Sequence, residues 1–128
     1  MTEPRWFSRE ECLALHDLML ADYGGLSGVR DENMLESALA KPRQLFSYGQ
    51  PTLAELGASY AAGVVKNHPF LDGNKRTGFM LGVAFLEING LVFFASEVEA
   101  TLRTLALAAG EMSESAYAVW LAKYSRPA

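Results

Sequence analysis

The sequence predicts an all-α fold, a compact bundle of about six helices around a buried central helix. Apolar residues recur at helical spacing in successive segments, and most of these segments begin with a residue type that caps helices. One segment, residues 79–89, is apolar around nearly its whole circumference, which is typical of a helix inside a domain. With 128 residues, half of them hydrophobic, we expect a single domain that spans residues 1–128.

Capping residues predict where the first two helices begin. Ser8 opens a capping box for a helix that ends near the glycine pair 24–25. Asp31 is expected to cap a short helix that Pro42 ends, because proline disfavours the helical conformation in the residue before it. Residues 43–51 contain aromatic and turn residues without a helical period. A small flap or hairpin and a plain surface loop fit this segment equally well.

The third helix and the central helix flank the most polar stretch of the chain. Thr52 opens a capping box for a helix that ends near Asn67, and Pro69 makes the chain turn at His68. The central helix follows and closes at Asn89-Gly90, where a glycine suits the C-terminal end.

Two further helices complete the chain after a brief extended link at residues 91–94. Ser96 and Ser113 are expected to cap them. Each carries apolar residues at helical spacing: Val98, Leu102, Leu105 and Ala109 in the first, and Tyr117, Trp120, Leu121 and Tyr124 in the second.

The composition argues against several classes of protein. A formal net charge of -4 and a pI near 5.1 argue against a broad basic surface for nucleic acid. The longest apolar run, residues 79–86, is too short to cross a bilayer, and the N-terminus lacks the apolar segment of a signal peptide. Cys12 is the single cysteine, so it cannot form an internal disulfide, and we expect it to be a packed thiol. These features favour a cytoplasmic protein without a membrane partner.

Polar residues are concentrated in residues 68–77, directly before the central helix. This stretch contains a histidine, an acid, a glycine, an amide and two fixed cations. The first N–H groups of a helix have no partner within it, and the helix dipole favours negative charge there. Together with Lys75 and Arg76, this arrangement predicts a phosphate-binding site.

His68 and Asp72 each have a catalytic and a structural interpretation. A neutral imidazole at His68 could take a proton from a hydroxyl nucleophile, or His68 could simply cap the preceding helix. Asp72 suits a Mg²⁺ ion that bridges phosphate oxygens, or it could cap the following helix. His16 is distant in sequence from other candidate ligands, so a structural or surface role is expected for it.

The rest of the stretch fits phosphate binding. Gly73 permits close approach of a ligand to the backbone. Asn74 could donate to a phosphate oxygen or organise the loop. Lys75 and Arg76 would neutralise charge on a transferring phosphoryl group. Phe70 is expected to be a hydrophobic anchor that seats the loop on the core.

Residues 68–76, His-Pro-Phe-Leu-Asp-Gly-Asn-Lys-Arg, closely resemble the signature H-x-F-x-[D/E]-[G/A]-N-[K/G]-R of the Fic/Doc (Fido) superfamily. Residues 24–42 and 89–120 also resemble its death-on-curing (Doc) branch. The resemblance implies a compact helical Fido fold in which a nucleotide lies on the motif loop and a target hydroxyl approaches His68. It also implies a flap that aligns the target, for which the candidate residues are Leu45, Phe46, Ser47, Tyr48 and Gly49.

By the same resemblance, His68 is the general base and Asp72 handles Mg²⁺. Asn74, Arg76 and the backbone after Gly73 hold phosphates. AMP-transferring relatives often have a small residue where this chain has Lys75, and a second arginine where it has Phe79. The Doc branch shares both departures.

The resemblance therefore implies phosphoryl transfer from ATP, with Mg²⁺, to a serine or threonine of a protein target. In the Doc branch that target is elongation factor Tu, and its modification arrests translation. The inhibitory pattern [S/T]-x-x-x-E-[G/N] of self-restrained Fic proteins is missing, because Gly28 occupies the Ser/Thr position before Glu32-Asn33. A type II toxin with a Phd-like antitoxin in trans is the implied system.

Three other functions stay open at the level of sequence. An AMP-transferase of the same fold remains possible because Gly73 matches the AMP-transferring motif. A non-catalytic module for antitoxin binding or autoregulation would use the fold without the chemistry. A DNA-binding helix-turn-helix is the poorest fit because of the acidic charge balance, and no direct nucleic acid binding is expected of the chain alone.

Overall fold

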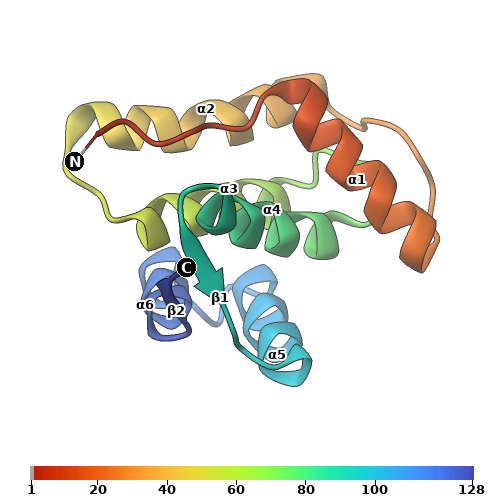
Figure 1. Cartoon of the computed structure of the whole chain (residues 1–128). Helices are drawn as coiled ribbons and strands as arrows, with labels where there is room; N and C mark the ends of the chain where they lie inside the picture. The colour runs from red at the N-terminus through yellow and green to blue at the C-terminus, as the bar shows by residue number, and fades with distance from the viewer. Residues whose placement is uncertain (1) are drawn as a thin grey trace.

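The structure, a computed structural model, describes residues 2–128, which form six helices and a two-stranded sheet (Figure 1). This confirms the predicted all-α class. The elements in chain order are α1 Arg9–Tyr23, α2 Glu32–Tyr48, α3 Leu53–Asn67, α4 Asn74–Ile88, β1 Leu91–Phe93, α5 Glu97–Ala108, α6 Glu114–Lys123 and β2 Ser125–Pro127.

The predicted helix caps are present. Ser8 and Thr52 form complete capping boxes at α1 and α3, each with a glutamate that bonds back to the capping residue. Ser96 and Ser113 accept hydrogen bonds from the first turns of α5 and α6. Asp31 likewise accepts from the Met34 N–H at the start of α2. Local side-chain chemistry therefore determines where five of the helices begin.

Helices α3 and α4 pack side by side in the middle of the molecule, with α1 and α2 on one side and α5 and α6 on the other (Figure 1). The predicted central helix, α4, does lie in the interior, but α3 is the more completely buried of the two. The two backbones approach closely, because a Cβ atom at Gly82 would lie only 2.9 Å from the carbonyl oxygen of Gly57. Small residues allow this contact.

Helix α2 does not end at Pro42, and residues 45–48 form neither a flap nor a loop. They are the last turn of α2, and Gly49 is its C-cap. Proline removes one hydrogen bond from a helix interior. Here Pro42 is buried against the core on the same face as Leu35 and Ala38, and Phe46 packs edge-on against Trp6. Apolar burial along this face offsets the lost bond and carries the helix past the proline.

The predicted extended link is confirmed as strand β1. Its antiparallel pairing with β2, in the register Leu91↔Pro127, was not predicted. The predicted apolar stripe of α5 faces solvent, with Val98 71% and Leu102 59% exposed. The buried face of α5 instead consists of Ala100, Thr104 and Leu107.

Within residues 2–128, no helix combines the length and the apolar character that crossing a bilayer requires.

Candidate active site

His68 is the C-cap of α3 and has a left-handed backbone conformation, φ 49° and ψ 57°. Among the described residues it is the one non-glycine residue with positive φ. Residues with side chains rarely adopt this conformation, and such outliers are enriched at functional sites. The conformation places an exposed imidazole at the turn between α3 and α4.

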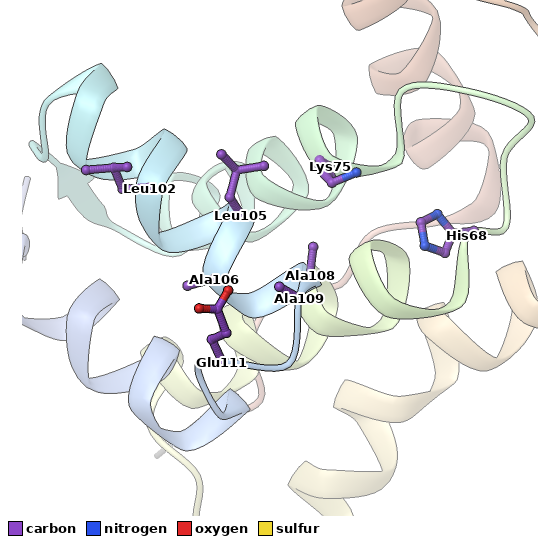
Figure 2. A pocket seen from close by; sticks show the side chains of 8 residues that line it. All are labelled: His68, Lys75, Leu102, Leu105, Ala106, Ala108, Ala109 and Glu111. Atoms are coloured by element: carbon purple, nitrogen blue, oxygen red, sulfur yellow. The ribbon is translucent and has the colours of Figure 1, made fainter.

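The imidazole of His68 lines a surface pocket of about 520 Å³ together with Lys75 from the first turn of α4. Figure 2 shows these two side chains on one side of the pocket and residues of α5 across from them. The α5 side is mostly apolar, contributed by Leu102, Leu105 and alanines. Glu111, which follows α5, adds a carboxylate to the lining (Figure 2). The pocket therefore combines one imidazole, one cation and one carboxylate with an apolar wall.

Phe70 is buried, with 1% of its surface exposed, as a motif anchor would be. Its ring is stacked on the imidazole of His16 from α1, with centroids 3.8 Å apart and planes inclined by 8°. The expected structural role of His16 is confirmed, since it is also buried. No sequence pattern indicated that these two rings meet.

Asn74 spans the motif loop. Its Oδ1 accepts from the Phe70 N–H at 3.0 Å, and its Nδ2 donates to the Phe70 carbonyl oxygen at 3.0 Å. Of the two roles considered for Asn74, the structure therefore displays loop organisation. One hydrogen of the amide is uncommitted in these bonds, and its use on a phosphate stays a prediction.

Asp72 is exposed, and its carboxylate is held by two backbone donors. Oδ1 accepts from the Gly73 N–H at 2.9 Å, and Oδ2 accepts from the Leu26 N–H at 3.2 Å. Asp72 does not cap α4, because Gly73 occupies that position without a side-chain cap. No group of three or more His, Cys, Asp or Glu residues within residues 2–128 could hold a metal ion. A Mg²⁺ ion at Asp72 would therefore need its remaining ligands from phosphate oxygens and water, which is its usual preference.

The N-terminus of α4 presents free donors and cations. Gly73, with φ 75°, begins the helix, and the N–H groups of the first turn point out of it without intrahelical partners. Lys75 and Arg76 are exposed and take part in none of the ion pairs formed within residues 2–128. The guanidinium of Arg76 lies over the ring of Tyr23, 4.6 Å from its centroid. This end of α4 suits an anion.

The candidate flap residues lie elsewhere. Leu45–Tyr48 end α2 and precede the start of α3, whereas His68 is at the other end of α3 (Figure 1). Helix α3 has 15 residues, and a helix rises 1.5 Å per residue, so about 20 Å separates them. The expectation that residues 45–50 align a target beside the motif is wrong for this structure.

Residues outside the motif hold it in place, and sequence reasoning assigned none of them a role in the site. Arg30 donates from Nε to the His68 carbonyl at 2.7 Å and from Nη2 to the Asn67 carbonyl at 2.9 Å. Val29 forms an isolated antiparallel bridge with Phe70. No local pattern could have revealed these contacts, because the partners lie far apart in the chain.

Comparison with known proteins agrees with this geometry. The model of the Fic/DOC family matches residues 6–86. The chain is 37% identical over 115 residues to "Protein kinase doc" of Escherichia phage P1, covering 89% of this chain and 90% of that protein. It is 36% identical over 94 residues to "Toxin Doc" of Mycolicibacterium smegmatis (strain ATCC 700084 / mc(2)155), covering 71% of this chain and 68% of that protein. An exposed histidine, an acid and the N-terminus of α4 lie together within the matched region. The chain belongs to the Fic/DOC family.

Proposed function

We propose that this protein is the toxin of a type II toxin–antitoxin system. We also propose that it transfers the terminal phosphoryl group of ATP to a serine or threonine hydroxyl of a protein. The observation that carries the proposal is that exposed His68 and Lys75 line the same pocket, beside the N-terminus of α4, which has no side-chain cap. The names of the relatives, "Protein kinase doc" and "Toxin Doc", support it.

The chemistry requires a base, an electrophile and charge neutralisation. The imidazole of His68 takes the proton of the target hydroxyl, whose oxygen bonds to the γ-phosphorus while the bond to the ADP oxygen breaks. Lys75, Arg76 and the first N–H groups of α4 stabilise the charge on the phosphoryl oxygens and on departing ADP. A bound Mg²⁺, held by Asp72, would supply further neutralisation of the phosphates.

Labelled ATP distinguishes this reaction from AMP transfer. Incubation of the protein with a cell extract and γ-labelled ATP is expected to label a protein, whereas α-labelled ATP is not. The same reactions with His68→Ala provide the control. Labelling from α-labelled ATP alone would show that the protein transfers AMP and is not a kinase. If neither form of ATP labels a protein, both enzyme activities are contradicted.

We propose elongation factor Tu as the target and the cytoplasm as the location, both on the resemblance to the Doc branch. Purified elongation factor Tu is expected to gain one phosphate, detected by mass spectrometry, and translation in vitro is expected to stop. A different labelled protein in the extract would contradict this target without affecting the phosphoryl transfer. Toxicity that survives His68→Ala would instead favour a non-catalytic module.

We further propose a Phd-like antitoxin that binds in trans. The solvent-facing stripe of α5 supports this, because Val98, Leu102 and Leu105 are 71%, 59% and 47% exposed. Leu102 and Leu105 also line the pocket. An apolar peptide that covers this stripe could block the pocket at the same time. Co-expression of a short neighbouring reading frame is expected to restore growth. Its product should bind Val98→Glu more weakly than the wild type.

A further inference from the structure

We propose that Arg30 and His16, which lie outside the motif, are positioning residues that separately hold its two functional halves. Arg30 would set the histidine that acts as base, and His16 would set the acid and the start of α4 that bind Mg²⁺ and phosphate. The kinetic part of this inference rests on the proposed phosphoryl transfer. The structural part concerns the conformation of the loop alone.

Arg30 contacts the first half of the loop. Its guanidinium donates to the carbonyl oxygens of Asn67 and His68, at 2.9 and 2.7 Å. These are orphan carbonyls at the C-terminal end of α3, where the helix dipole also favours a cation. The backbone N–H of Arg30 donates to the Pro69 carbonyl at 2.7 Å. Three consecutive carbonyls are thus fixed by one residue.

These bonds hold His68 in a conformation that it would otherwise rarely adopt. Its φ of 49° lies in the left-handed region, which side chains disfavour. The guanidinium of Arg30 bonds the carbonyl oxygen of Asn67, before His68, and that of His68 itself. Because the guanidinium is planar and rigid, the two bonds together fix the orientation of this peptide. Loss of the guanidinium frees the peptide to relax, and the imidazole then leaves its position in the pocket that it lines with Lys75.

His16 contacts the second half of the loop. Its Nε2 lies 2.8 Å from the carbonyl oxygen of Asp72, and a carbonyl oxygen only accepts, so Nε2 carries the hydrogen. Its ring is stacked on Phe70. His16 therefore fixes the peptide between Asp72 and Gly73, whose N–H in turn binds the Asp72 carboxylate. The orientation of the carboxylate and of the first turn of α4 follows from that peptide.

The two supports act on separate parts of the loop. The contacts of Arg30 end at Pro69, and those of His16 begin at Phe70. The two residues also belong to different segments, α1 and the link before α2. Removal of either one should therefore disturb its own half of the site and leave the other half in place.

A comparison of Arg30→Ala with His16→Phe in the full chain tests this separation. Arg30→Ala is expected to lower kcat by roughly 10- to 100-fold with little change in KM for ATP, because small misplacement of a base is costly. His16→Phe keeps an aromatic ring against Phe70 but loses the donor to Asp72. It is expected to weaken binding of Mg²⁺ with a non-hydrolysable ATP analogue by roughly 10- to 100-fold.

Histidine-selective isotope labelling gives a readout that needs no reaction, because the chain has two histidines. The Cα and Cβ chemical shifts of His68 report its backbone conformation. These shifts are expected to move away from left-handed values in Arg30→Ala and to stay unchanged in His16→Phe. Because His16→Phe leaves His68 as the one labelled histidine, its spectrum also identifies the His68 signal. Arg9→Ala is the matched control, since it removes an exposed arginine that pairs with Glu32 away from the motif.

Conservative variants sharpen the result. Arg30→Lys keeps the charge but cannot reach two carbonyls in the same way, so it should restore kcat only in part. His16→Gln keeps a donor and should retain more nucleotide affinity than His16→Phe. Circular dichroism and melting temperature check folding. If both His16 variants unfold, the exposed Arg30 still provides a decisive test.

Unchanged His68 shifts in Arg30→Ala would overturn the proposal, and so would equal losses of kcat and nucleotide affinity in both variants. Absence of phosphoryl transfer by the wild-type protein is a different outcome. It would contradict the proposed function, while the chemical shifts and the nucleotide affinity would still decide whether the two residues position the loop.

Discussion

The backbone N–H of Leu26 donates a hydrogen bond of 3.2 Å to Oδ2 of Asp72, so the link between α1 and α2 holds the acidic residue of the motif. The link approaches so closely that a Cβ atom at Gly25 would lie 2.8 Å from the same oxygen. Oδ1 is held by the Gly73 N–H. Both carboxylate oxygens are therefore held by backbone donors.

Gly25→Ala should weaken binding of Mg²⁺ with an ATP analogue by roughly 10-fold or more, because the new methyl group displaces the carboxylate that would hold the ion. Gly24→Ala is the matched control. Both glycines have positive φ, 126° and 79°, but nothing lies within 4 Å of a Cβ at Gly24. Isothermal titration calorimetry compares the two affinities. Similar values for both variants would mean that backbone strain, and not the contact with Asp72, explains the effect.

Asn74→Ala is expected to lower the free energy of unfolding by about 1–3 kcal/mol, because the buried N–H and carbonyl of Phe70 lose their partners. Asn74→Asp should be similarly unstable near neutral pH, where a carboxylate faces that carbonyl. Its stability should recover partly as the pH falls and the carboxyl regains a donor. Urea unfolding at several pH values measures this. Lys75→Ala, at the exposed neighbour, should change stability by less than about 0.5 kcal/mol.

Gly78→Ala should destabilise the protein even though alanine is the better helix former by about 1 kcal/mol. A Cβ atom there would lie 2.6 Å from Cγ2 of Val65 and 3.0 Å from the carbonyl oxygen of Ala61, so α3 and α4 would have to separate. Overpacking of this kind costs about 1–3 kcal/mol. Thermal unfolding reports the loss. At Gly49, where the nearest atom would be 3.9 Å away, the same substitution should be nearly neutral.

Stability should decline at alkaline pH as buried groups ionise, and two of them have large pKa shifts. Burial raises the pKa of Tyr117 from its ordinary value of 10.0 to about 12, and that of Cys12 from 9.0 to about 11. Both groups are neutral when protonated, so their contribution is complete below the ordinary pKa and falls as the pH rises towards the raised one. A shift of two units corresponds to roughly 2–3 kcal/mol for each group.

Chemical unfolding between pH 8 and about 11 measures this decline. In Cys12→Ala the free energy of unfolding should fall less steeply between pH 9 and about 10 than in the wild type, because the thiol no longer contributes. Identical slopes would argue against a role for the thiol. The same burial predicts that Cys12 resists alkylation in the folded protein.

Prediction from the sequence was accurate where structure depends on near neighbours. Helix starts at Ser8 and Thr52 depend on a side chain and a backbone N–H three residues apart. It was wrong at Pro42, where the local rule predicts a helix end and packing of α2 on α3 decides otherwise. Prediction from the sequence also missed that the apolar stripe of α5 containing Val98 and Leu102 faces solvent. Helical spacing identifies the apolar face of a helix but not whether another element packs on that face.

The sequence by itself determined the all-α class, the helix caps and the chemical inventory of the motif, since each depends on residues within a few positions of one another. Only the tertiary structure decided which side chains hold that motif. His16 meets Asp72 across 56 positions, and Arg30 meets His68 across 38. Such contacts exist because α1 and the link before α2 pack against the turn between α3 and α4. No short-range pattern carries information about that packing.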